Sequence, residues 1–275
     1  DCAREVLAQA LDREVDLADC MREALRAGLV VESGAERLRF AHALVRDALL
    51  EELTPIGNTR RALHARIAGA LENAHAGVAD GIAELARHAC EAAPLFDAER
   101  AAELARRAGL HAAQFHDHEG AAGWYERALA MRELAGAIDA GMDAELHLGL
   151  AAARSRAVGL ERARPLYRRA RELAESAGRE DLAARAALGF ADRPDAGGAG
   201  HLDVVSVLEA ALRRGLASES VLRTRLLSRL AAELRYVDRA RAEALLEEAL
   251  RAARGLGDAA ALAQTLGDST FVRFS

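Results

Sequence analysis

The chain has 275 residues, of which 51% are apolar and only 4% aromatic, and its formal net charge is −6. This length allows about two domains with buried cores, whereas the acidic balance disfavours a nucleic-acid-binding domain, which concentrates Lys and Arg. All 37 Lys and Arg residues are arginine, so the chain has no lysine for a Schiff base or for the phosphate-binding loop of a P-loop ATPase.

The cysteines and the hydropathy profile indicate a cytoplasmic protein. Cys2, Cys20 and Cys90 are too far apart for a zinc-binding or redox motif, and they are typical of small buried residues in a reduced compartment. No apolar run reaches about 18 residues, the length of a membrane span, and no signal peptide is recognisable. Because the chain starts at Asp1 and stops after STFVRFS, we expect both ends to be cuts in a longer polypeptide.

Residues 1–58 are expected to form a small winged-helix domain. The segment CAREVLAQAL has helical spacing, and Asp16 is placed to cap a second helix that ends at Gly28. LVVES and RLRFA flank GAE and predict a hairpin, after which HALVRDALLEEL returns to a helical pattern. That pattern directs four residues toward the core: Leu44, Val45, Ala48 and Leu49. The alternative is a small α+β cap on a helical array.

DNA binding by this domain is disfavoured by its charge. Residues 1–58 carry twelve acids and seven arginines. A winged helix usually reads the major groove with its second helix, and an acidic domain would be repelled by the phosphate backbone.

Residues 59–275 are expected to form TPR-like helical repeats, which makes the fold class mostly α. Short connections with Gly or Asp separate helical segments, and a small residue, a large apolar residue and an alanine recur at fixed spacing. The pattern occurs three times: Ala121-Tyr125-Ala128, Ala163-Tyr167-Ala170 and Ala242-Leu246-Ala249. Small residues let neighbouring helices approach closely, and Gly109 and Gly149 are expected to serve the same purpose. The tetratricopeptide period is about 34 residues, whereas the spacing here is irregular, so a featureless α-solenoid is the alternative.

Stacked helix pairs are expected to form a curved solenoid with a concave face that binds a partner. The last helix would be the first of a further pair, so the array is expected to continue beyond residue 275.

Three stretches resemble one known group of proteins: LRFAHALVRDALLEEL, IAELARHACEAAPLFDAERAAELARRAG and LLSRLAAELRYVDRARAEALLEEALRAARGLGD. They look like the middle of large bacterial STAND-type ATPase regulators, which include MalT-like and LuxR-family proteins and ATPases fused to adenylate cyclase. In such proteins a P-loop ATPase module precedes a winged helix and TPR pairs. This chain has no P-loop, so the resemblance implies a sensor and interaction fragment without enzyme activity or cofactor. ATP or ADP would be bound by the ATPase module of the parent chain.

The resemblance also implies a role for His42. In related switch ATPases, a winged-helix histidine contacts the bound ADP phosphates and holds the closed state. His42 lies at the start of a predicted helix, where anions are favoured, and Arg46 follows one turn later. The pair is therefore a candidate nucleotide-sensing site, and the alternative is a histidine that only caps the helix.

Two other sets of residues admit both a binding and a structural explanation. His111, His116, Asp117 and His118 lie close together, but metal binding needs three or four converging ligands, so an exposed polar turn is favoured. Trp124 and Tyr125 fall on repeat positions, which favours packing over a ligand groove. The arginines of RPLYRRARELAE are balanced by acids, which favours a solvated face over a site for RNA or an acidic peptide.

The sequence therefore favours a regulatory fragment of a signal-transducing transcriptional regulator. It would bind a protein or small-molecule effector through its repeats and act on the ATPase module of the same parent chain. The alternative is a stand-alone TPR adaptor for protein–protein interaction with no link to nucleotide. An enzyme, such as a metal hydrolase that uses the histidine cluster, is the least favoured class. No nucleic-acid or membrane partner is expected.

Overall fold

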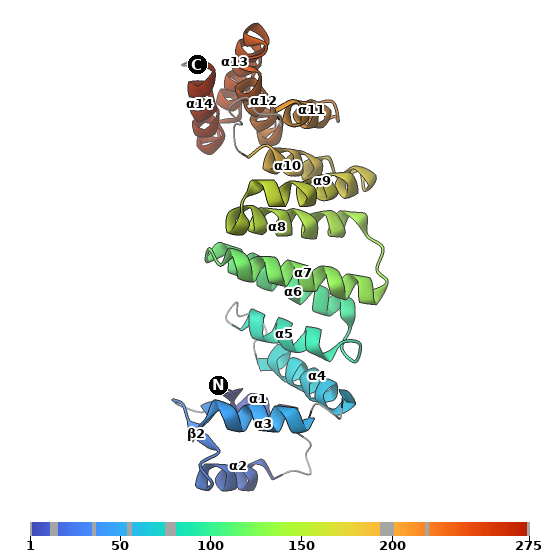
Figure 1. Cartoon of the computed structure of the whole chain (residues 1–275), viewed down its shortest axis with the longest axis vertical. Coiled ribbons are helices and arrows are strands. Elements are labelled where there is room, and N and C mark those ends of the chain that lie inside the picture. The colour runs from blue at the N-terminus through green and yellow to red at the C-terminus, as the bar shows by residue number, and fades with distance from the viewer. Residues whose placement is uncertain are drawn as a thin grey trace. The chain divides into compact units, whose positions relative to one another are not determined.

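In the computed structural model, residues 2–11, 16–34, 37–53, 57–74, 81–192, 201–217 and 220–273 are described. This part of the chain is mostly helical, with fourteen helices and one small antiparallel sheet (Figure 1). It divides into two compact units, Asp1–Phe115 with Glu126–Ala137, and His116–Tyr125 with Ile138–Ser275. Helix α7 (His118–Ala135) contributes residues to both units.

The first unit begins with α1 (Arg4–Ala10), α2 (Leu17–Arg26) and a sheet of β1 (Cys2–Ala3), β2 (Val30–Glu32) and β3 (Arg37–Phe40). The strand order is β1-β3-β2, with Cys2 opposite Leu38 and Val30 opposite Phe40. Helix α3 (Ala43–Leu53) follows, so the predicted winged-helix order of helix, helix, hairpin and helix is confirmed. The Asp16 carboxylate caps α2 by accepting the N–H groups of Ala18 and Asp19. The strand β1 was not predicted, because two residues are too few for a periodic pattern.

The expectation that α3 buries four residues against the core is wrong. Leu44 is 82% exposed and Leu49 is 42% exposed, and Ala48 is also exposed. The reason is that α1, and not α3, packs extensively against the next helix, α4 (Gly57–Ala74), while α3 makes only limited contact with β3 and α4. The predicted domain boundary at residue 58 stays a prediction.

The rest of the first unit is a helical stack. Helix α4 packs against α5 (Ile82–Ala92), and α5 packs against α6 (Ala98–Gln114). The Asp97 carboxylate caps α6 by accepting the N–H of Arg100 at 2.6 Å. The shared core is rich in alanine and includes Leu85, Ala86 and Leu104. Small side chains permit close helix–helix approach, as the repeat pattern predicted.

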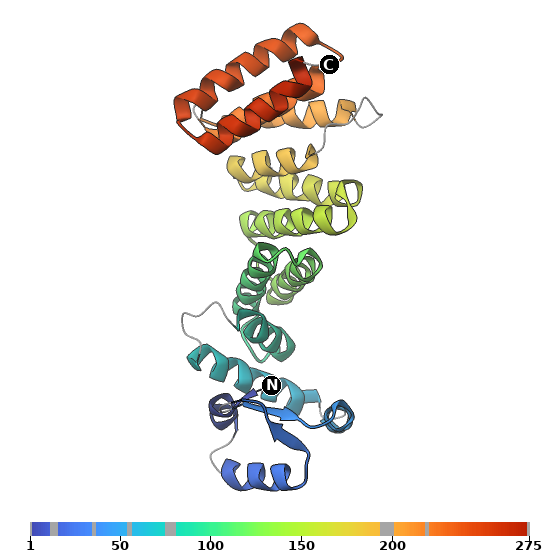
Figure 2. The ribbon, with the colours of Figure 1, turned by 90° about the vertical axis from the view of Figure 1, so that its left-hand side faces the viewer.

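The second unit continues through seven helices that follow α7. These are α8 (Ala140–Val158), α9 (Leu160–Ser176), α10 (Glu180–Phe190), α11 (His201–Leu212), α12 (Val221–Leu234), α13 (Arg239–Leu256) and α14 (Ala259–Arg273). The hairpins are α8–α9, α10–α11 and α12–α13, and the first helices of the hairpins also contact one another in the order α8, α10, α12 and α14 (Figures 1 and 2). Each second helix packs against the next first helix. This is the hairpin packing of TPR-like repeats, so the predicted fold class is confirmed.

The repeat signature has a direct structural basis in two tyrosines. A Cβ added at Gly149 of α8 would lie 2.5 Å from Cζ of Tyr125, and one added at Gly189 of α10 would lie 2.2 Å from Cε1 of Tyr167. Each ring of a second helix therefore packs directly on the backbone of the next first helix, where only glycine fits. The predicted need for a small residue at Gly149 is confirmed.

Among the described helices, none combines the length with the apolar character that crossing a bilayer would need.

Candidate functional site

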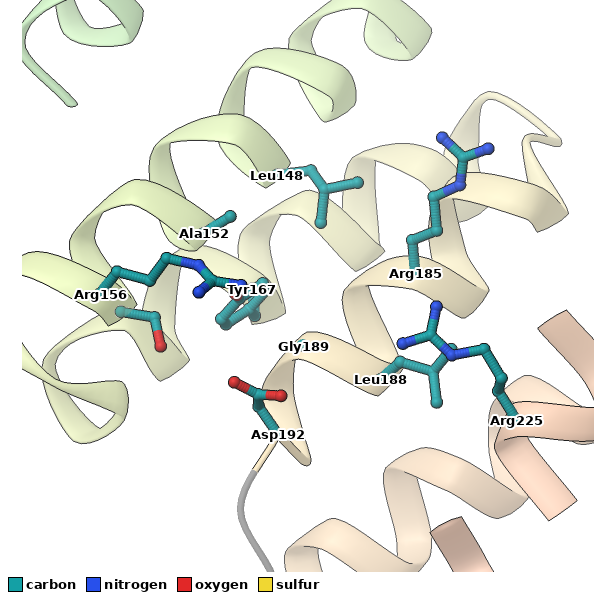
Figure 3. Close-up of a pocket in the computed structure, with 10 residues that line it drawn as sticks. Leu148, Ala152, Arg156, Tyr167, Arg185, Leu188, Gly189, Asp192 and Arg225 are labelled. Carbon is teal, nitrogen blue, oxygen red and sulfur yellow. The ribbon is translucent and has the colours of Figure 1, made fainter. Parts of the chain in front are cut away.

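The second unit contains a pocket of about 240 Å³ where α8, α9, α10 and α12 meet (Figure 3). Its apolar side is formed by Leu148, Ala152, Leu188 and Gly189. Its polar side is formed by Arg156, Arg185, Arg225, Asp192 and Tyr167, with Ser155 beside them. The pocket therefore joins the first helices of three successive hairpins, and it places positive charge next to aliphatic surface.

Helical spacing explains why these side chains converge. On α8, Leu148, Ala152 and Arg156 follow one another at intervals of four residues and so lie on one helix face. On α10, Arg185 and Gly189 are related in the same way. The absence of a side chain at Gly189 admits the Tyr167 ring between α9 and α10.

The pocket arginines differ from several other arginines of this unit in forming no ion pair with an acidic side chain among the described residues. Arg179 is paired with Glu145 and Asp181 at 3.5 and 3.0 Å, and Arg223 of α12 is paired with Glu248 at 3.1 Å. In the described part of the chain, Arg156, Arg185 and Arg225 form no ion pair within 4.0 Å, although the carboxylate of Asp192 lines the same pocket.

The guanidinium groups of the three pocket arginines point in different directions. Figure 3 shows Arg156 and Arg225 extending toward the pocket from opposite sides, with Asp192 between them, whereas Arg185 extends away from Asp192. The Nε atom of Arg225 is buried, and no described residue accepts a hydrogen bond from it.

Tyr167 remains a neutral hydroxyl in this environment. Burial raises its pKa to about 12, and the negative charge of Asp192 acts in the same direction. A hydrogen bond with Ser155 and the positive charge of Arg156 oppose these effects but are smaller. The hydroxyl therefore stays protonated at neutral pH and acts in hydrogen bonding rather than as a base.

His42 and Arg46, the candidate nucleotide-sensing residues, belong to the first unit. His42 is exposed and directly precedes α3, and its carbonyl accepts the N–H of Val45 at 3.2 Å. The Arg46 guanidinium donates two hydrogen bonds to the Asp47 carboxylate, at 2.8 and 2.7 Å. The predicted position of His42 at the start of a helix is confirmed, whereas its role toward nucleotide stays a prediction.

The histidine cluster forms a helix-capping turn. The carboxylate of Asp117 accepts the N–H of Gly120 at 2.9 Å at the start of α7, and the rings of His116 and His118 lie 5.9 Å apart. Within the described ranges, no three His, Cys, Asp or Glu side chains converge in a way that could hold a metal ion.

Another pair of histidines lies in the first unit, between α4 and α5. The rings of His64 and His88 are 4.9 Å apart, and burial lowers the pKa of both, to about 4 for His88. The positive charge of Arg87 also contributes to the low pKa of His88. This histidine stack is therefore neutral at physiological pH and behaves as a packing contact.

The sequence analysis did not identify the arginine pocket. A usable signal was present, because Arg156 and Arg225 have no acidic residue three or four positions away on their own helices. Most exposed helical arginines of the chain have such a neighbour, at a spacing that allows the two side chains to interact along the helix. The convergence of the two residues across α8 and α12 depends on repeat stacking and has no local signature.

Comparison with known proteins adds one structural likeness. No family model and no curated protein matches the chain. The structure is similar to that described as "Crystal structure of YrrB: a TPR protein with an unusual peptide-binding site", with 15% sequence identity and a TM-score of 0.49. The match covers 80% of this chain and 98% of that chain.

Proposed function

We propose that this chain is a non-enzymatic protein-interaction module that binds a peptide segment of a partner at the pocket of α8, α9, α10 and α12. The observation that carries the proposal is the pocket itself, in which aliphatic side chains adjoin arginines without acidic partners among the described residues. Ligand sites of this kind combine apolar surface with a few polar groups that fix orientation.

The repeat scaffold supports this function. The first helices of successive hairpins lie side by side in the second unit, so their exposed faces form a continuous surface. Repeat proteins of this type commonly bind partners along such surfaces. No nucleophile with an adjacent base lines the pocket, and the Tyr167 hydroxyl is held neutral.

Occlusion of the pocket tests the proposal. Ala152 is exposed and lines the pocket, so Ala152→Trp should fill its opening without disturbing the core. Ala244→Trp is a matched control, since Ala244 is exposed on α13 and does not line the pocket. Both variants and the unmodified chain would be screened against an array of random decapeptides.

The expected result is a set of peptides that bind the unmodified chain and Ala244→Trp but not Ala152→Trp. Equal binding by Ala152→Trp would place the ligand elsewhere and contradict the proposal, as would an array on which the unmodified chain retains no peptide.

The resemblance to STAND-type regulators supplies a second candidate function, a sensor fragment that acts on an ATPase module of the same parent chain. The observation that favours it is the exposed ring of His42 next to the first turn of α3, with Arg46 one turn away. ATP or ADP would then be held by the ATPase module. In a parent polypeptide that contains such a module, His42→Ala should accelerate ADP release, and unchanged ADP retention would refute this role.

A further inference from the structure

We propose that a groove between α1 and α2 binds helix α3 of a second copy of this chain. The contact lies in the first unit, so it goes beyond the peptide pocket of the second unit and does not depend on it. Two apolar surfaces of the same unit carry the inference, an open groove and an exposed helix.

The groove has a volume of about 600 Å³ and an apolar floor. Leu17, Met21 and Leu25 recur at intervals of four residues along α2, so they lie on one face of this strongly amphipathic helix. Ala8 of α1 lines the groove with them. No residue of α2 is buried. An amphipathic helix normally packs its apolar face against another element, and the described part of the chain supplies no such cover for α2.

Helix α3 is an apolar surface of matching kind. Its residues Leu44, Leu49 and Leu50 are 82%, 42% and 41% exposed. Within residues 43–52 only Val45 is half-buried, and the others are exposed. An isolated helix of eleven residues is marginal in water, so burial of these leucines against another surface would stabilise α3.

The groove cannot receive α3 of its own chain. Only Ala41 and His42 separate α3 from β3, and the pairing of β3 with β1 and β2 fixes the position of that strand. Figure 2 shows α1 and α3 on opposite sides of the strands. Helix α3 of another copy has no such restriction. The contact would join two different surfaces, and such heterologous contacts connect copies head to tail.

Positive charge predominates among the charged residues that line the groove. These are Arg4 and Arg22 with one acid, Glu5. Each arginine also forms an ion pair with an acid that does not line the groove, Arg4 with Glu32 and Arg22 with Asp19. Because all four side chains are exposed and such pairs contribute little to stability, both arginines can exchange these acids for those of a bound helix.

Helix α3 has the opposite balance of charge. It carries three acids, Asp47, Glu51 and Glu52, and a single arginine, Arg46, which pairs with Asp47 at 2.7 Å. Glu51 and Glu52 are exposed and follow directly after the leucines. With its leucines on the groove floor, α3 would bring these glutamates toward the arginines of the groove. An acidic amphipathic helix therefore fits this groove in both apolar character and charge, and the chain itself presents one.

Sedimentation velocity of the whole chain, from micromolar to sub-millimolar concentration, tests the proposal. The unmodified chain should associate reversibly. Leu44→Glu on α3 and Met21→Glu in the groove should each weaken the association about ten-fold or more, because each places an unpaired charge in the contact. Ile138→Glu is the matched control, since Ile138 is 99% exposed and belongs to the second unit. Circular dichroism would verify the fold of each variant, and Leu49→Glu and Leu25→Glu would replace a variant that does not fold.

An equimolar mixture of the two variants is the sharper test. A Leu44→Glu copy keeps an intact groove, and a Met21→Glu copy keeps an intact α3. The mixture should therefore form a one-to-one dimer with a single intact contact, although each variant alone is monomeric. Two apolar patches that associate without this pairing of helix and groove would not be restored by mixing.

The remaining outcomes overturn the proposal. A chain that is monomeric over the whole concentration range would leave the groove to a helix of another protein. Association that persists undiminished in Leu44→Glu and Met21→Glu would place the contact elsewhere. A mixture that stays monomeric would contradict the insertion of α3 into the groove. Peptides that bind the pocket of the second unit should bind both variants unchanged, so failure here leaves the proposed function intact.

Discussion

Replacement of Gly149 by alanine should destabilise the second unit, although the same replacement in a helix normally stabilises. A Cβ at Gly149 would lie 2.5 Å from Cζ, 2.6 Å from Cε1 and 3.0 Å from Cε2 of Tyr125. Contacts between carbon atoms are optimal at about 3.5–4.0 Å, so the ring or the helix must move by roughly 1 Å. Tyr125 is only 4% exposed, and the surrounding core leaves little room for that movement.

Two opposing contributions set the expected magnitude. Overpacking a well-packed core costs about 1–3 kcal/mol, whereas alanine is favoured over glycine within a helix by about 1 kcal/mol. Because the added Cβ would meet a buried ring at 2.5 Å, the overpacking cost should lie in the upper part of this range, at about 2–3 kcal/mol. Gly149→Ala should therefore lower the free energy of unfolding by about 1–2 kcal/mol. Gly123 of α7 is the matched control, because a Cβ there would meet no atom within 4 Å. Gly123→Ala should raise the free energy of unfolding by up to about 1 kcal/mol.

Urea unfolding followed by fluorescence and circular dichroism would measure both effects. Trp124 is the single tryptophan and is adjacent to Tyr125, so its emission reports on this part of the chain. In a Tyr125→Leu background, the cost of Gly149→Ala should shrink, since the ring that causes the clash is gone. Equal or greater stability of Gly149→Ala relative to the unmodified chain would refute the close-packing argument.

Three further predictions follow from buried polar groups. Glu233→Ala removes the partner that the buried Arg229 guanidinium contacts at 2.6 Å and leaves it only the weaker attraction of Asp268 and Asp192. Urea unfolding should therefore show a loss of about 3 kcal/mol, against less than about 1 kcal/mol for Glu243→Ala in an exposed pair. The pKa of His88 is lowered from 6.5 to about 4, so the unfolded chain takes up its proton first as the pH falls. The contribution of neutral His88 to stability is therefore complete above pH 6.5 and is lost progressively between pH 6.5 and about 4. His88→Leu should flatten this part of a plot of melting temperature against pH. Burial raises the pKa of the Cys90 thiol to about 11, so iodoacetamide should modify Cys90 far more slowly than the exposed Cys20 of α2. A mass-spectrometric time course would compare the two rates, and equal rates would contradict the burial of Cys90.

The helical part of the fold was predictable because its determinants are local or periodic. The positions of Ala163, Tyr167 and Ala170 on one helix face follow from their spacing, and all three are buried. The cap at Asp16 and the left-handed glycine at Gly28 were equally visible, since each is specified by a single residue type next to a periodic segment. Such features depend on the chain within a few residues of them.

Features that depend on competition between distant segments were not predictable. The apolar pattern of α3 is consistent with burial, yet Leu44 is exposed because α1 occupies the position against α4. Periodicity shows which residues of a helix share a face, but it does not show which of two apolar helices packs against a third. The short strand β1 likewise exists only because β3 offers it a partner.

The candidate site combines both kinds of determinant, which explains why only its scaffold could be predicted. Gly189 is required by the repeat packing of Tyr167, and the same residue lines the pocket. The chemistry of the pocket comes instead from Arg156 and Arg225, which are far apart in sequence and have no acid within one helical turn of themselves. An arginine without an acidic residue one helical turn away must find its counter-charge in the solvent, in another element or in a ligand. The stacking of α8, α10 and α12 brings two such arginines and Asp192 to one pocket, and the proposed function assigns the remaining N–H donors to a ligand.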